Sequence, residues 1–307
     1  MLKPRALKSG DRIAVVAPAS PFKRDEFDAG IAELCSIGFE PVYDESVFAA
    51  TRYVAGSPAV RAAAISAAWT DRSVAGVIAV RGGFGSSQIL PLLDRDEARR
   101  ARKPFIGYSD LTSLLTFLTT GCELVAFHGP MLVGRLGRGE AGYDRHSLLN
   151  AVARPVPMGE LAPEGLEVIA RGDATGPLLG GTISQLVGSL GTPHAFKPPS
   201  RYVLLLEEVG ERPYKLDRMI TQLRQAGLLA HAVAVLVAQL LDCDEPTGEL
   251  TARTVIHELF RDFPGPVVIG FPSGHTNGPA MTLPLGVACR VVADSRPRLV
   301  IEEAAVE

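Results

Sequence analysis

The chain has 307 residues, of which 47% are hydrophobic and 21% are charged, so it can form sizeable cores and lacks the composition of a disordered protein. Its 31 Lys and Arg against 34 Asp and Glu give a net charge of −3. That balance argues against a nucleic-acid-binding protein or a protein held on membranes by basic patches.

The spacing of the cysteines and the length of the apolar runs indicate the cellular compartment of the protein. Four widely spaced cysteines with no CxxC pair form neither a disulfide framework nor a zinc signature, which suits a reducing compartment. No apolar stretch follows the basic amino terminus, and no apolar run is long enough to span a bilayer. We therefore expect a soluble cytoplasmic protein without a membrane partner.

The first half of the chain alternates strand-like apolar runs with helical patterns. The expected strands cover residues 12–17, 38–42, 74–80, 104–106 and 123–127, and the expected helices cover 25–37 and 60–69. This alternation predicts an α/β domain over residues 1–150, with a parallel sheet covered by helices. The pattern loosens between Met131 and Glu164, and we place a linker at 151–165 after a helix at 144–153.

A second set of elements predicts a mixed α/β domain over residues 166–307. Strands are expected at 166–170, 202–206, 233–239 and 267–270, and helices at 214–226 and 250–260. Short strands at 280–285, 288–292 and 298–302, separated by turn residues, indicate antiparallel pairing near the carboxyl end.

The segment Lys103–Leu115 has the pattern of a strand-to-helix turn that carries a serine. A short apolar run ends at Gly107, and Ser109 stands where a helical pattern begins, as in a nucleophile elbow. The amide of Asp110 would then help to bind an oxyanion. The glycine that usually follows two residues after such a serine is replaced by Leu111. On these residues alone, Ser109 could instead be a helix N-cap.

The loop Arg81-Gly-Gly-Phe-Gly-Ser-Ser87 directly follows the third expected strand. Its glycines allow backbone amides to face an anion. The glycine spacing is not that of a dinucleotide-binding loop, and no acidic residue lies on a strand about twenty residues later. We expect a tight turn or an oxyanion-binding loop beside the serine, and no nucleotide cofactor.

Two of the six histidines are placed where a general base would be expected. His128 ends a strand, and His275 lies in a glycine-framed loop after an apolar strand. Spacing does not choose between them. A carboxylate that orients the base would come from the acidic segment 207–211, which ends a buried strand, although an ordinary acidic loop is the alternative. The acidic cluster 242–245 lacks partners at ligand spacing, so no metal is expected.

Several further motifs occur in a fixed order along almost the whole chain. They are Gly10–Ile13, Ala17–Ser20, Arg81–Gly85, Ile106–Asp110, Phe127–Met131, Gly176–Gly181, Leu206–Met219 and Gly274-His275. In this order they resemble the LD-carboxypeptidase family, the serine peptidases typified by muramoyl-tetrapeptide carboxypeptidase. The fold implied is an amino-terminal parallel α/β domain of the Rossmann or flavodoxin type and a carboxyl-terminal mixed α/β domain of the swivelling type.

The resemblance also implies the residues of the active site. It assigns a triad of Ser109, Glu207 and His275, and so decides for His275 over His128. An oxyanion hole formed by the amides of Gly83 and Asp110 is implied as well. Arg81 is a candidate for binding the free carboxylate of a substrate.

The family's typical reaction hydrolyses the bond between the L-centre of meso-diaminopimelate and the terminal D-alanine of murein tetrapeptide, during cell-wall recycling in the cytoplasm. It requires no cofactor, and a homodimer is typical. Two alternatives remain at this point. Members that resemble microcin-C immunity peptidases cleave aminoacyl-nucleotide amides and stack an aromatic side chain on the base, but the only tryptophan here, Trp69, lies in an early helix. A binding protein without catalytic activity is the other alternative.

Overall fold

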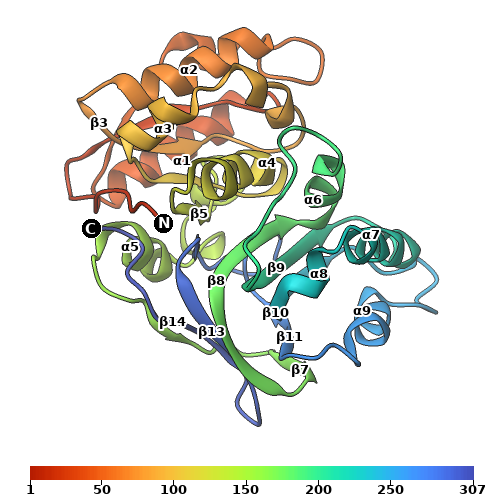
Figure 1. Cartoon of the computed structure of the whole chain (residues 1–307). Helices are drawn as coiled ribbons and strands as arrows, with labels where there is room; N and C mark the ends of the chain where they lie inside the picture. The colour runs from red at the N-terminus through yellow and green to blue at the C-terminus, as the bar shows by residue number, and fades with distance from the viewer.

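The computed structural model describes all 307 residues and contains two β-sheets with helices packed on them (Figure 1). The first sheet has the strand order β12-β5-β4-β3-β1-β2, and the second has the order β6-β14-β13-β8-β9-β10-β11-β7. The two chain termini lie side by side, where the Glu307 amide donates to the Pro4 carbonyl at 3.0 Å. The sequence-based prediction of a two-part α/β fold is confirmed.

The first sheet is parallel except at one edge. Its strands are β1 (Arg12–Val16), β2 (Glu40–Val42), β3 (Val74–Ala79), β4 (Phe105–Gly107), β5 (Ala126–His128) and β12 (Leu283–Leu285), of which β12 runs antiparallel to β5. The helices of this half are α1 (Arg24–Ser36), α2 (Pro58–Thr70), α3 (Arg95–Ala101), α4 (Thr112–Thr116) and α5 (Arg145–Ala153). Because these strands are parallel, the loops after β1, β3, β4 and β5 all lie at the carboxyl ends of the strands.

The second sheet is mixed and contains the long strand β8. Its strands are β6 (Gly159–Leu161), β7 (Glu167–Ala170), β8 (Gly172–Thr182), β9 (Tyr202–Val209), β10 (Ala232–Leu241), β11 (Val267–Phe271), β13 (Ala288–Ala293) and β14 (Arg298–Ile301). The helices are α6 (Ile183–Ser189), α7 (Pro213–Gln225), α8 (Leu228–His231) and α9 (Ala252–Phe260). The first part of β8 pairs antiparallel with β13 and the last part pairs parallel with β9, so one curved strand joins both regions (Figure 1).

The two halves are more interleaved than the sequence indicates. Strand β6 lies inside the predicted linker 151–165 and forms an edge of the second sheet, whereas β12 leaves the carboxyl-terminal half to complete the first sheet. The domain boundaries at 150 and 166 stay a proposal.

The two faces of the second sheet belong to different cores. Along β9 the side chains alternate: Val203 and Leu205 join the large core of the first sheet, whereas Leu204 and Leu206 join a smaller core under α7 and α9. This two-residue alternation is what a strand buried on both faces requires. Since the large core includes residues of both sheets, burial of apolar surface holds the two halves together.

No helix of the protein has both the length and the apolar character needed to cross a membrane.

Candidate active site

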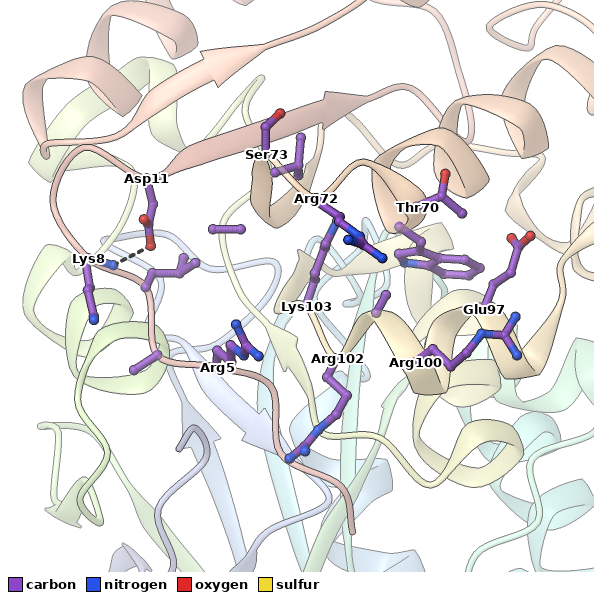
Figure 2. A pocket seen from close by; sticks show the side chains of 16 residues that line it. Arg5, Lys8, Asp11, Thr70, Arg72, Ser73, Glu97, Arg100, Arg102 and Lys103 are labelled. Atoms are coloured by element: carbon purple, nitrogen blue, oxygen red, sulfur yellow. Dashed lines mark hydrogen bonds between the residues drawn. The ribbon is translucent and has the colours of Figure 1, made fainter.

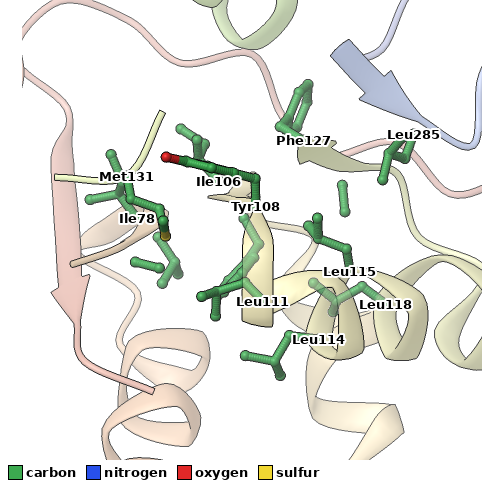
Figure 3. Close-up of a cluster of buried hydrophobic side chains, with 14 of the residues drawn as sticks. Ile78, Ile106, Tyr108, Leu111, Leu114, Leu115, Leu118, Phe127, Met131 and Leu285 are labelled. Carbon is green, nitrogen blue, oxygen red and sulfur yellow. The ribbon is translucent and has the colours of Figure 1, made fainter. Parts of the chain in front are cut away.

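Ser109 lies at the sharp turn between β4 and the helix that follows. Its φ of +65° is in the left-handed region, which a residue with a Cβ seldom adopts and which costs about 1–2 kcal/mol. No helix-capping hydrogen bond comes from the serine side chain, so the N-cap interpretation is wrong. The neighbours Tyr108, Leu111 and Leu114 are anchored in the core around the turn (Figure 3). Anchoring on both sides fixes a strained backbone that turns the hydroxyl out of the core, as in a nucleophile elbow.

Glu207 and His275 form a hydrogen-bonded pair next to this turn. Glu207 is in the last part of β9, and its Oε2 lies 2.7 Å from the His275 Nδ1 and 3.3 Å from the His275 amide nitrogen. The carboxylate is fully buried, whereas the imidazole keeps 18% of its surface exposed. Since Nδ1 is occupied, Nε2 is the ring nitrogen left free for proton transfer.

The pKa of Glu207 shows that this buried carboxyl is kept ionised. Burial acts to raise the pKa, but the hydrogen bond and charge of His275, the charge of His128 and a hydrogen bond from Thr182 together lower it to about 2. The next residue, Glu208, faces the other side of the strand and accepts the Ser184 amide at 2.8 Å, and burial raises its pKa. Strand alternation thus separates the two acids, and only Glu207 faces the imidazole.

Thr182 and Tyr108 connect the serine turn to the pair of Glu207 and His275. The Thr182 hydroxyl lies 3.2 Å from the Ser109 carbonyl oxygen and also contacts Glu207 Oε1. The ring of Tyr108 packs edge-on against the imidazole of His275, with 4.9 Å between the centroids. The predicted serine, acid and base are therefore brought into one site, although they come from both halves of the chain.

His128 occupies a different position. It is fully buried, its Nδ1 lies 2.9 Å from the Ser273 hydroxyl, and its Nε2 has no hydrogen-bond partner. Burial lowers its pKa to about 4, which the charge of Glu207 only partly opposes. It contributes a neutral ring beneath the loop that carries His275.

We expect this buried histidine to make stability depend on pH. Unfolded His128 binds a proton below its ordinary pKa of 6.5, whereas the folded protein does so only near 4, so stability falls as the pH drops through that interval. The expected loss is roughly 2 kcal/mol between pH 6.5 and about pH 5, above the interval in which Glu207 titrates. Urea unfolding at both pH values measures it. His128→Gln should lose less stability on the same change of pH, and an equal loss would contradict the assignment.

Glycine is required where the His275 loop crosses the acid. Gly274 has a φ of +75°, and a Cβ there would lie 2.8 Å from Glu207 Oε2 and 2.9 Å from the His128 ring. A side chain would therefore both strain the backbone and push the acid away from its partner.

The glycine loop after β3 lies against the serine turn. Gly83 has a φ of +98°, and a Cβ on the preceding Gly82 would approach the Ser109 Cβ to 3.0 Å and the Asp110 amide nitrogen to 3.3 Å. The Ser86 amide donates to Asp110 Oδ2 at 2.8 Å, and the Ser86 hydroxyl donates to the Asp110 carbonyl at 2.6 Å. These bonds fix the glycine loop against the turn that carries the serine.

Arg61, which sequence analysis did not single out, holds the glycine loop in place. Arg61 is buried, and its Nη1 donates to the carbonyls of Pro18 and Gly85, both at 2.7 Å. The predicted substrate contact, Arg81, is exposed on this loop, and its Nη1 donates to the Pro21 carbonyl at 3.0 Å. In the alanine-rich helix α2, a buried arginine gives no sequence signal that would separate it from a surface arginine.

Arg135 does the same for the His275 loop. It is buried, and its Nη2 donates to the carbonyls of Gly274 at 2.9 Å and Thr276 at 3.0 Å. Its Nη1 donates to the Gly278 carbonyl at 3.0 Å. One guanidinium from the first half of the chain thus binds the backbone on both sides of His275.

Replacing this guanidinium should therefore misplace the base. We expect Arg135→Lys to lower kcat roughly 100-fold with little change in KM, because one ammonium cannot bind all these carbonyls and a shift of about 1 Å has effects of that size. Steady-state kinetics measure the effect. The exposed Arg138, three residues later, supplies the matched Arg138→Lys control. Equal kcat values in both variants would show that Arg135 does not position the base.

The acidic cluster 242–245 has structural roles. Asp244 Oδ1 accepts the amide of Ala252 at the start of α9, and Glu245 pairs with Arg212 at 3.4 Å. No group of three or more His, Cys, Asp or Glu side chains is placed to hold a metal ion.

The serine turn, the ionised acid and the histidine come together where strands of the two sheets end. This is the architecture of a serine hydrolase. Family models described as the LD-carboxypeptidase N-terminal and C-terminal domains match residues 13–129 and 175–291. The chain belongs to the LD-carboxypeptidase family and is a serine-type carboxypeptidase.

Individual relatives agree over almost the whole length. A putative carboxypeptidase of Streptomyces coelicolor is 37% identical, covering 96% of this chain and 94% of that protein. A probable murein peptide carboxypeptidase of Bacillus subtilis is 32% identical, covering 92% and 89%. The solved structure of the microcin C7 self-immunity protein MccF with aspartyl sulfamoyl adenosine has a TM-score of 0.88 at 22% identity and covers both chains completely, which shows a common fold.

Proposed function

We propose that Ser109, His275 and Glu207 act as a catalytic triad. The observation that carries this proposal is the contact of the buried Glu207 with His275, 2.7 Å apart, beside a serine held at a φ of +65°. The ionised carboxylate fixes the imidazole tautomer and stabilises the charged imidazolium that forms during catalysis.

In the mechanism we propose, the Ser109 hydroxyl loses its proton to His275 Nε2 and attacks the carbonyl carbon of the penultimate residue. The oxyanion that forms accepts hydrogen bonds from the amides of Gly83 and Asp110. The imidazolium then protonates the departing amine, which breaks the peptide bond and leaves an acyl-serine. Water, deprotonated by the same imidazole, hydrolyses the ester and restores the serine.

The substrate we propose is the murein tetrapeptide L-Ala-D-Glu-meso-diaminopimelate-D-Ala, from which the terminal D-alanine is removed. Support comes from the relative named as a probable murein peptide carboxypeptidase and from the motifs shared over the whole chain. Arg81, exposed on the glycine loop, is our candidate for the substrate carboxylate. On the same resemblance we propose that the enzyme works in the cytoplasm, in peptidoglycan recycling, as a homodimer.

Mass spectrometry of the purified protein incubated with this tetrapeptide tests the proposal. We expect release of D-alanine and a tripeptide by the wild type and not by Ser109→Ala. The matched substrate with terminal L-alanine should be cleaved much more slowly. No release from folded wild-type protein would contradict the murein substrate.

Aminoacyl-sulfamoyl adenosine is the second substrate to assay, because MccF has been solved with such a compound. The position of Trp69 argues against this substrate. This tryptophan is buried and lines a cavity at the start of β3, whereas the proposed triad lies beyond the carboxyl ends of the strands. Trp69 therefore cannot stack on a base bound at Ser109.

A further inference from the structure

A cavity of about 850 Å³ lies at the amino ends of the strands of the first sheet (Figure 2). It is bordered by the amino-terminal segment 5–8 and by the residues that lead into β3 and β4. Lys103, which lines the cavity, precedes β4, and Ser109 follows the other end of the same strand. The cavity is therefore separate from the proposed active site.

The lining of this cavity is strongly cationic. Its cationic residues are Arg5, Lys8, Arg72, Arg100, Arg102 and Lys103, and its acidic residues are Asp11 and Glu97. Six positive and two negative side chains leave a local charge of +4, in a chain whose net charge is −3. Positive charge is thus concentrated in one concave place, where low-dielectric walls strengthen its field.

Two of these cations are fixed in place by the fold. The Arg102 guanidinium donates to the Lys3 carbonyl at 2.9 and 2.7 Å and pairs with Glu307. The Lys103 ammonium donates to two backbone carbonyls, at 2.7 and 2.6 Å. Both side chains are partly buried; Glu307 balances the charge of Arg102, so Lys103 supplies the fixed positive charge of this wall.

The other four cations have no partner. The side chains of Arg5, Lys8, Arg72 and Arg100 are exposed and take part in no hydrogen bond or ion pair within the protein. The two carboxylates of the lining, Asp11 and Glu97, can offset only two of the six positive charges. Like charges gathered around a cavity repel one another, and a bound anion would remove that repulsion.

We propose that this cavity binds a small anion that carries two or more phosphate groups. Its volume is that of ordinary small-molecule sites, but its lining is mainly charged, so the ligand must be polar. Arginine forks bind phosphate oxygens in pairs, and three guanidinium groups without a partner (Arg5, Arg72 and Arg100) line this cavity.

The chain contains a built-in reporter for this site. Trp69 is the only tryptophan, and it lines the cavity. Titration with inorganic pyrophosphate at constant ionic strength should produce a saturable change in tryptophan fluorescence, with matching heat in calorimetry. Removing two charge-assisted contacts in Arg72→Gln/Arg100→Gln should weaken binding about tenfold or more.

Arg154→Gln/Arg218→Gln is the matched control, because it removes the same charge from exposed, unpaired arginines that do not line the cavity. A parallel titration with ADP, which has the same number of phosphates as pyrophosphate, distinguishes the source of the phosphate. Tighter binding of ADP than of pyrophosphate assigns the site to nucleotides, and equal binding assigns it to the phosphate chain alone. No saturable signal with either probe by both methods, or equal weakening in the control variant, would overturn the proposal.

Discussion

Ser109→Ala should lower turnover of the murein tetrapeptide by roughly six powers of ten, the size of effect seen when a triad serine is removed. Without the hydroxyl no acyl-enzyme forms, and only the oxyanion-binding amides and substrate binding remain to accelerate the reaction. Quantifying released D-alanine by mass spectrometry over long incubations gives the residual rate. Turnover within tenfold of the wild type would remove Ser109 from the mechanism.

A second substitution at this position separates chemistry from folding. Ser109→Gly should be equally inactive but more stable than Ser109→Ala, because glycine adopts a φ of +65° without the Cβ penalty. The expected difference in the free energy of unfolding is roughly 1 kcal/mol. Urea denaturation of the two variants measures it. Equal stabilities would show that the turn stores no strain, whatever the effect on activity.

Much of this site follows from local sequence. The apolar run that ends at Gly107, followed by leucines at helical spacing, predicts the turn at Ser109. Similarly, the apolar run that precedes Glu207 predicts a buried strand that ends in acids, and strand β9 confirms it. These features were predictable because burial determines which positions of a short segment are apolar, and the spacing of those positions distinguishes a strand from a helix.

Other parts of the site could not be predicted locally. Strand β8 has four glycines and a proline in eleven residues, a composition that ordinarily argues against a strand. It forms because pairing with both β13 and β9 overrides local preference. Thr182, which contacts both the serine turn and the acid, stands at the end of this strand and was missed with it.

The arrangement of the two halves of the chain could not be predicted either, because tertiary packing determines it and the local pattern of apolar residues does not. The choice between His128 and His275 rested on a family resemblance, because the spacing of the two residues carries no distance information. In the structure, the large shared core and the bonds of Arg135 to Gly274 and Thr276 place the His275 loop beside Ser109.

His275→Ala should reduce turnover almost as much as Ser109→Ala, because the serine then has no base to accept its proton and the leaving amine has no acid. Glu207→Gln should cost less, roughly four powers of ten, since an amide can occupy the same place but favours the wrong imidazole tautomer. His128→Gln is the control histidine, and we expect its turnover to stay within about tenfold of the wild type because its ring bonds Ser273 and not the acid.

Combining substitutions tests whether these residues act as a unit. In a triad, Ser109→Ala/His275→Ala should be no slower than Ser109→Ala alone, because the base has nothing to activate once the hydroxyl is gone. Independent contributions would instead multiply, giving a double variant slower by the product of both losses. If His128→Gln proved more damaging than His275→Ala, the base would be His128, and the 2.7 Å pair of Glu207 and His275 would hold the loop in place without taking part in proton transfer.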